Sequence, residues 1–200
     1  MAGRPRTISD ERLLAAVASA VGRVGVARLT LAEIARDAGV TTGALVQRFG
    51  SKRELLLAHA RSASVWSPLE ARAAFATAPD PVEGIVRAVV LSVDADRSPQ
   101  EFANHLGWLG LELADDEFRE LLARQGERVR EQLAEFLREA AEQGRLRLGG
   151  EDEVLELAEL LDTVRHGAQI SWAVAREGRV AETVRRRLET VLAPYRTPPG

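Results

Sequence analysis

The chain has 200 residues, of which 46% are hydrophobic and only 4% aromatic, so its core must consist mostly of Leu, Val and Ala. It contains no cysteine, which excludes a disulfide framework, a thiol nucleophile and a cysteine-based zinc site. The net charge of −3 is unevenly distributed, because residues 1–61 carry ten basic and five acidic residues, and residues 62–200 carry seventeen and twenty-five. This asymmetry indicates a nucleic-acid-facing module joined to an acidic remainder, and chance clustering of charges on exposed helix faces is the alternative.

Other classes of protein are excluded by motifs that the sequence lacks. No apolar run approaches the roughly 18 residues of a membrane-spanning helix, and the polar N-terminus resembles no signal peptide, so we expect a cytoplasmic protein without membrane contact. The three histidines lie far apart and form no metal-binding pair, and no phosphate loop or Gly-x-Ser-x-Gly motif is present. We therefore expect no metal, no cofactor and no enzymatic activity.

The first predicted helix begins after Ser9, a good N-cap residue that is followed by two acidic residues favourable in a first turn. Its apolar positions repeat at helical spacing, and two glycines end it. The apolar positions are Leu13, Leu14, Val17 and Val21.

The next three predicted helices each begin with a capping residue. Thr30 opens a Thr-x-x-Glu capping box, and this helix ends at Gly39. Thr41 caps a short helix over residues 42–49. A second capping box, Ser-Lys-Arg-Glu, opens a longer helix that Pro68 interrupts or kinks.

The rest of the chain alternates between apolar helical stripes and breaks at proline and glycine. Further helices are expected over residues 82–93, 100–113, from 115 onwards, 152–177 and 179–194. The total is about nine helices, three short and six longer, and no segment shows the alternation typical of a strand. The expected fold class is therefore all-α.

The two short helices at residues 31–38 and 42–49, joined by a glycine turn, have the geometry of a helix-turn-helix. In that motif the second helix enters the DNA major groove with its N-terminal residues towards the base edges. An ordinary helical hairpin is the alternative on topology alone, because helix pairs joined by glycine are common.

The residues from Leu29 to Leu56 carry a more specific pattern. It contains Thr-Leu-Ala-Glu-Ile-Ala in the first helix, Ala-Gly-Val at the turn, Gly-Ala-Leu-Val-Gln-Arg-Phe in the second, and Ser-Lys-Arg-Glu-Leu at the next helix start. This pattern resembles the DNA-binding signature of the TetR family of transcriptional regulators over about residues 8–57. The resemblance implies a three-helix DNA-binding domain over residues 1–57 and a helical ligand-binding and dimerisation domain over residues 58–200.

Four residues are expected to contact the DNA backbone. The resemblance implies that the hydroxyls of the capping residues Thr30 and Thr41 lie near phosphates, and a capping role alone is the alternative for each. Lys52, the only lysine in the chain, stands where the family has a lysine and is expected to reach a phosphate. Arg48 is expected to bind a phosphate as well.

Base reading is expected from the outward side of the helix over residues 42–49. The hydroxyl and methyl groups of Thr42 can contact bases, Gly43 permits close approach, and Gln47 can pair with adenine or a phosphate. Val46 stands where the family usually has tyrosine. It cannot donate a hydrogen bond, and it leaves an apolar surface for a thymine methyl group.

A basic arm precedes the first helix. It contains Arg4 and Arg6, separated by Pro5. We expect it to reach phosphates or a minor groove, and a disordered solubilising tail is the alternative.

The last two helices are candidates for a homodimer interface, because a two-fold operator needs two recognition helices about 34–36 Å apart. Their apolar stripes would form a four-helix bundle across the dimer, as the resemblance also implies, and packing inside the monomer is the alternative. The stripes consist of Val154, Leu157, Leu161, Val164 and Ala168 within residues 152–177, and of Val180, Val184, Leu188 and Val191 within residues 179–194.

The resemblance also implies that the middle helices enclose a site for a small-molecule effector. The candidate lining residues, for each of which simple core burial is the alternative, are Trp66, Phe102, His105, Trp108, Phe118 and Trp172. The expected function is that of a repressor released from double-stranded operator DNA by a small molecule. An activator, and a helical adaptor that senses no ligand, are the alternatives.

Overall fold

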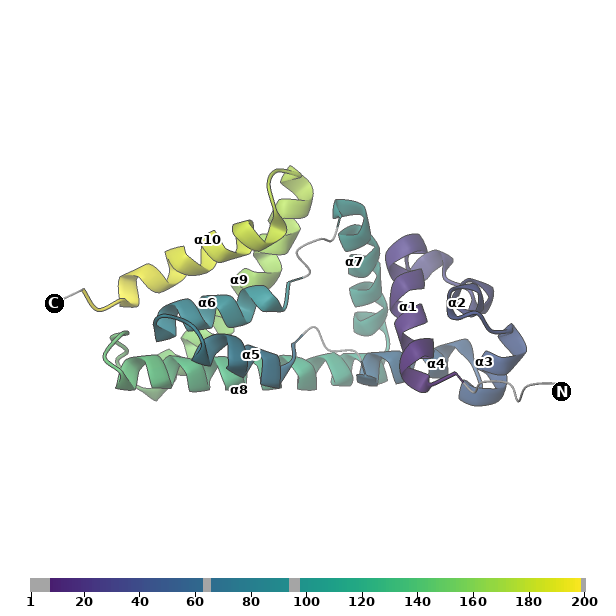
Figure 1. The fold of residues 1–200 in the computed structure, drawn as a ribbon, viewed down its shortest axis with the longest axis horizontal. Helices are drawn as coiled ribbons and strands as arrows, with labels where there is room; N and C mark the ends of the chain where they lie inside the picture. Colours follow the sequence, from purple (N-terminus) through teal and green to yellow (C-terminus); the bar gives the residue numbers. More distant parts are fainter. Residues whose placement is uncertain (1–7, 63–65, 94–97, 199–200) are drawn as a thin grey trace. The chain divides into compact units, whose positions relative to one another are not determined.

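The computed structural model describes residues 8–62, 66–93 and 98–198. These residues form ten α-helices and two short 3-10 helices, which confirms the predicted all-α class (Figure 1). None of the described helices is long and apolar enough to cross a membrane. The chain divides into two compact units.

The first unit comprises Met1–Ser64 and Gln100–Leu122. Its helices are α1 (Asp10–Val24), α2 (Leu31–Ala38), α3 (Thr42–Phe49), α4 (Lys52–Ser62), nearly all of α7 (Pro99–Ala114) and the first turns of α8 (Asp116–Glu142), and the 3-10 helix η1 (Val26–Arg28) follows α1. The buried faces of α1 to α4 share one core with Phe118 of α8. The unit therefore contains α7, which the expected boundary at residue 57 assigns to the C-terminal domain.

Polar contacts fix α7 and α8 within the first unit. The Asn104 side chain donates a hydrogen bond of 2.7 Å to the carbonyl of Gly22 in α1. The Arg53 guanidinium of α4 forms two hydrogen bonds of 2.9 Å to the Asp115 carboxylate, which also accepts from the backbone N–H of Glu117 at the start of α8. Asp115 thus caps α8 and ties its first turn to α4.

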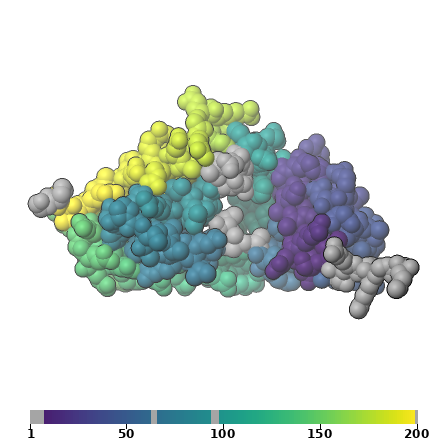
Figure 2. Space-filling view, viewed as in Figure 1, coloured from purple at the N-terminus to yellow at the C-terminus, as the bar shows by residue number. Residues whose placement is uncertain are grey.

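The second unit comprises Val65–Pro99 and Ala123–Gly200. Its helices are α5 (Pro68–Ala76), α6 (Pro81–Leu91), the rest of α8, α9 (Glu151–Ala175) and α10 (Val180–Leu192), followed by the 3-10 helix η2 (Ala193–Tyr195). Helices α5 and α6 pack as a pair, and α10 packs against both α9 and α6. Figure 2 shows α5 and α6 in blue and teal on the surface of this unit, beside the yellow α10.

Aromatic packing and a short backbone bridge complete the second unit. Phe75 of α5 and Phe136 of α8 stack with their ring centroids 4.4 Å apart. The Arg147 N–H donates to the carbonyl of Tyr195 over 2.8 Å, and the Thr197 N–H donates to the carbonyl of Arg145 over 3.0 Å. This bridge holds the described C-terminal residues against the loop between α8 and α9.

The helix count differs from the predicted nine because Pro68 begins a helix of its own. Proline lacks an N–H, but the N–H of a first helical residue has no intrahelical partner in any case, so proline is favourable there. The Ser67 hydroxyl caps this helix by accepting from the Glu70 N–H. Of the two expected effects of Pro68, a break between helices is therefore confirmed and a kink within one helix is not, and α5 is the additional helix.

The apolar stripes of α9 and α10 pack inside the chain. Seven of their nine members are buried in the monomer, and Val164 and Val191 are half-buried. The buried members are Val154, Leu157, Leu161, Ala168, Val180, Val184 and Leu188. The expectation that these stripes face a second subunit is therefore wrong, because α9 and α10 cover each other and α10 also covers α6.

Candidate nucleic-acid interface

The turn between α2 and α3 is a tight helix-turn-helix connection. Gly39 ends α2 with φ 70° and ψ 35°, a left-handed conformation that costs glycine little because it has no Cβ. Thr41 follows in an extended conformation, and its hydroxyl accepts from the Ala44 N–H over 3.1 Å to begin α3. The predicted elements and their caps at this turn are confirmed.

Most of α3 is exposed to solvent, as a helix that enters a groove must be. Leu45 is buried in the core and Phe49 is half-buried, so these two residues form its inner face. The candidate base-reading residues Thr42, Gly43, Val46 and Gln47 are all exposed. A Cβ built on Gly43 would meet only the Thr41 hydroxyl, at 3.8 Å, so the backbone is open to a ligand on this side.

The two capping threonines retain a free donor. The Thr30 hydroxyl accepts from the Glu33 N–H over 3.2 Å, as the capping box predicts. Because a hydroxyl accepts and donates independently, the O–H of each cap can still reach a phosphate oxygen. The Glu33 carboxylate does not complete the box but pairs with Arg23 over 2.7 Å, and this hydrogen bond lowers the pKa of Glu33.

Two of the candidate phosphate-binding cations, Lys52 and Arg48, have partners within the chain. The Lys52 ammonium donates to the carbonyl of Leu29, and one Arg48 N–H donates to the carbonyl of Ile8 over 2.6 Å. Arg48 also pairs with Asp10 over 2.6 Å. Lys52 keeps further N–H donors for a phosphate, whereas the charge of Arg48 is balanced by a carboxylate. The arm residues Arg4 and Arg6 lie outside the described residues.

Comparisons with known proteins show which family the helix-turn-helix resembles. Residues 13–59, which span most of α1 and all of α2 to α3 with the greater part of α4, match the model of bacterial regulatory proteins of the tetR family. Residues 13–59 are therefore a DNA-binding domain of the TetR family. A known relative, the HTH-type transcriptional regulator BetI of Rhizobium meliloti (strain 1021), is 33% identical over 132 residues, which cover 66% of this chain and 65% of the relative.

Solved structures share the TetR fold over nearly the whole chain. A putative transcriptional regulator from Saccharomonospora viridis in complex with choline has a TM-score of 0.75 at 21% identity, covering 92% of this chain and 95% of its own. A TetR transcription regulator from Haloarcula marismortui has a TM-score of 0.74 at 17% identity, covering 94% and 98%. The family match also agrees with the prediction of a regulator rather than an enzyme.

Four of the predicted effector-site residues belong to the first unit. Phe102 and Phe118 are buried, and His105 and Trp108 are half-buried. The Trp108 indole donates to the Glu112 carboxylate over 2.7 Å, and burial raises the pKa of Glu112. The Trp108 ring meets Phe118 edge-on, with centroids 6.0 Å apart.

The other two predicted effector-site residues belong to the second unit. Trp66 is buried and donates from its indole nitrogen to the Gln132 side chain over 2.6 Å. Trp172 is buried and donates to the carbonyl of Gly178 over 3.0 Å. Within their own units, four of the six predicted residues are therefore buried and two are half-buried.

A buried polar row on α9 was missed by sequence reasoning. Asp162, Arg165 and Gln169 are each less than 9% exposed. The Arg165 guanidinium donates to the Asp162 carboxylate over 2.7 Å, and the Gln169 amide donates to the carbonyl of Arg165 over 3.2 Å. Their spacing puts them on the side of the helix that carries the buried leucines. This spacing in the sequence could have predicted that they are buried.

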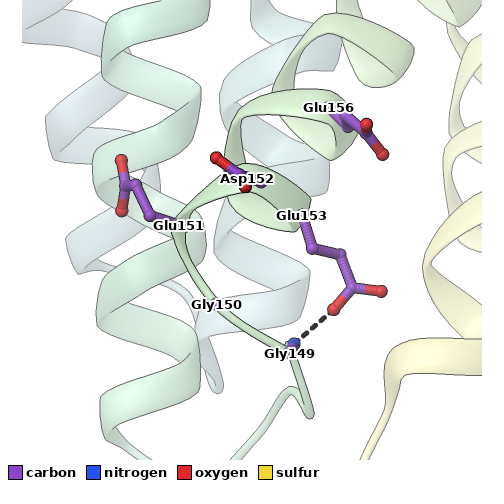
Figure 3. A pocket seen from close by; sticks show the side chains of 6 residues that line it. All are labelled: Gly149, Gly150, Glu151, Asp152, Glu153 and Glu156. Carbon is purple, nitrogen blue, oxygen red and sulfur yellow. Dashed lines mark hydrogen bonds between the residues drawn. The ribbon is translucent and has the colours of Figure 1, made fainter.

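An open acidic hollow of about 510 Å³ lies at the start of α9 (Figure 3). Its carboxylates stabilise α9, because negative charge is favourable at a helix N-terminus. Glu153 accepts from the Gly149 N–H, and Glu151 pairs with Arg138, which lowers the pKa of Glu151. Among the described residues, no group of three or more His, Asp or Glu side chains is arranged to hold a metal ion.

Proposed function

We propose that this chain is a transcriptional repressor that binds double-stranded operator DNA as a homodimer and is released by a small molecule. The observation that carries the proposal is the exposed outer face of α3 in a TetR-family helix-turn-helix. Selection of bound fragments from the DNA of the source organism would test it. We expect enrichment of a two-fold sequence whose half-sites are one helical turn apart, and no enrichment over bulk DNA would contradict the proposal.

The proposed DNA contacts divide into two sets, borne by a domain comprising residues 1–57. Backbone contacts come from Thr30, Thr41 and Lys52, together with the arm residues Arg4 and Arg6. Base contacts come from Thr42, Gly43, Val46 and Gln47. Because Val46 offers only an apolar surface, the operator of this chain should differ from those of relatives with tyrosine at this position.

A Lys52→Ala variant should bind every DNA sequence more weakly. The slope of log affinity against log salt concentration is negative, and removing one phosphate contact should reduce its absolute value by about 0.9. Fluorescence anisotropy titrations with operator and scrambled DNA at four salt concentrations would measure this. A loss confined to the operator, with an unchanged slope, would contradict phosphate binding by Lys52.

A Thr42→Ala variant should instead change the preference at a single base pair. The lost hydroxyl and methyl contacts are expected to cost about 1–3 kcal/mol against the preferred base and little against others. Titration against operators substituted one base pair at a time would locate the affected position. Equal weakening on operator and scrambled DNA would rule out base reading by Thr42.

The proposed dimer uses a face of α9 that the sequence stripes did not identify. Leu160, Ile170 and Val174 are all exposed in the monomer, although they are large and apolar. Together with Gly167, which has open space around it, they follow one another at helical spacing along one side of α9. An exposed apolar stripe of this kind is typical of a surface that binds another protein chain. Two such helices facing each other would form the centre of a four-helix bundle.

We further infer that residues 58–200 carry the effector site as well as the dimer interface. The buried row of Asp162, Arg165 and Gln169 supports this, because charged residues in an apolar interior are rare without a structural or functional reason. The six aromatic and histidine candidates named above remain proposals. A thermal-shift screen of small metabolites, including choline because a structural relative binds it, would test for an effector. No shift with any compound would favour a regulator that senses no ligand.

A further inference from the structure

Two basic side chains, Arg48 of α3 and Lys52 of α4, each donate a hydrogen bond to a backbone carbonyl. Each of these carbonyls lies just before the N-cap of a different helix. Lys52 donates to the carbonyl of Leu29, which precedes the N-cap Thr30 of α2. Arg48, in the last turn of α3, donates to the carbonyl of Ile8, which precedes the N-cap Ser9 of α1. Arg48 therefore joins the recognition helix to a segment 40 residues earlier in the chain.

Arg48 contacts the residues on either side of the α1 N-cap in the sequence, Ile8 and Asp10. Its Nη1 atom lies 2.6 Å from the carbonyl oxygen of Ile8, and its Nε atom lies 2.6 Å from a carboxylate oxygen of Asp10. Ser9, between these two residues, caps α1 by accepting from the Arg12 N–H. A forked guanidinium can hold a carbonyl and a carboxylate at once, so the side chain fixes the first turn of α1 relative to α3.

We propose that Arg48 is a positioning residue for DNA binding, which fixes the start of α1 against the recognition helix, and is not a ligand of a DNA phosphate. The inference rests on the proposed DNA-binding function. Two of its donor atoms are committed to the chain, and the Asp10 carboxylate neutralises its charge. A nearby phosphate therefore meets a nearly neutral pair, and Arg48 releases no counterion when DNA binds.

The Asp10→Asn variant distinguishes the two roles by the sign of its effect. If Arg48 binds phosphate, removing its competing carboxylate should strengthen DNA binding, since a negative charge also leaves the interface. If Arg48 is a positioning residue, the same change weakens the clamp. The operator affinity should then fall about two- to fivefold, the range expected from one exposed ion pair.

The Arg48→Gln variant supplies a second readout, the salt dependence of binding. We expect about a tenfold loss of operator affinity, with the slope of log affinity against log salt concentration unchanged. The Lys52→Ala variant serves as the reference for a true phosphate contact, with its slope lowered by about 0.9. The matched control is Arg119→Gln, because Arg119 forms an exposed pair with Asp116 in the first turn of α8 and should leave DNA affinity unchanged.

Tighter binding by Asp10→Asn, or a lowered salt slope in Arg48→Gln, would overturn the proposal while leaving the DNA-binding function intact. If the unmodified protein binds no selected DNA fragment, the proposed function fails and this inference fails with it. Asp10→Asn removes one charge from an exposed side chain and keeps the Ser9 cap, so it decides between the roles even if Arg48→Gln does not fold.

Discussion

An Ile170→Asp variant should be monomeric at micromolar concentration and should lose operator binding. Ile170 is 45% exposed and lies in the middle of the apolar stripe of α9, between Leu160 and Val174. In a two-fold dimer each substitution is present twice in the same interface. At about 2 kcal/mol or more for each buried hot-spot residue, dimer affinity should fall by roughly a thousandfold.

Loss of the dimer should abolish operator binding because a single recognition helix contacts only one half-site. Light scattering after size exclusion would report the mass, and anisotropy titration would report the operator affinity. Leu69→Asp is the matched control, since Leu69 is an apolar residue of the same unit that is 81% exposed outside the α9 stripe. A dimer of normal affinity in the Ile170→Asp variant would exclude this face as the interface.

The sequence predicts the helix-turn-helix well because its signals are local. Thr30, Thr41 and Ser51 each cap a helix three residues before the N–H group that they accept from, and this spacing is visible in the sequence. Gly39 similarly ends α2 in the left-handed conformation that a C-terminal glycine favours. No distant residue is needed to predict these elements.

The prediction fails where the outcome depends on tertiary contacts. The apolar stripe of α10 does not reveal whether it packs on its own chain or on a second copy, and Val184 and Leu188 prove to be fully buried in the monomer. The sequence likewise gives no sign that the Arg48 side chain contacts Asp10 and Ile8, which lie 38 and 40 residues earlier in the chain. Periodicity and charge identify a face or a cation, but they do not identify its partner.

A Gly84→Ala variant should destabilise the protein even though alanine is the better helix former. A Cβ added at Gly84 of α6 would lie 2.8 Å from the carbonyl oxygen of Phe75 and 2.9 Å from its ring, so α5 would have to move. Phe75 cannot easily yield, because it is buried and stacked on the fully buried Phe136. Overpacking of about 1–3 kcal/mol should outweigh the gain of nearly 1 kcal/mol in helix propensity.

Urea denaturation followed by circular dichroism would measure the loss of stability, which should be larger in a Gly84→Val variant because valine is bulkier and branched at Cβ. Gly110→Ala is the matched control, since Gly110 lies within α7 and a Cβ there meets no atom within 4 Å. The same substitution should therefore stabilise the protein at position 110 through helix propensity alone. If both variants gain stability, the close approach of α5 to α6 does not require glycine at position 84.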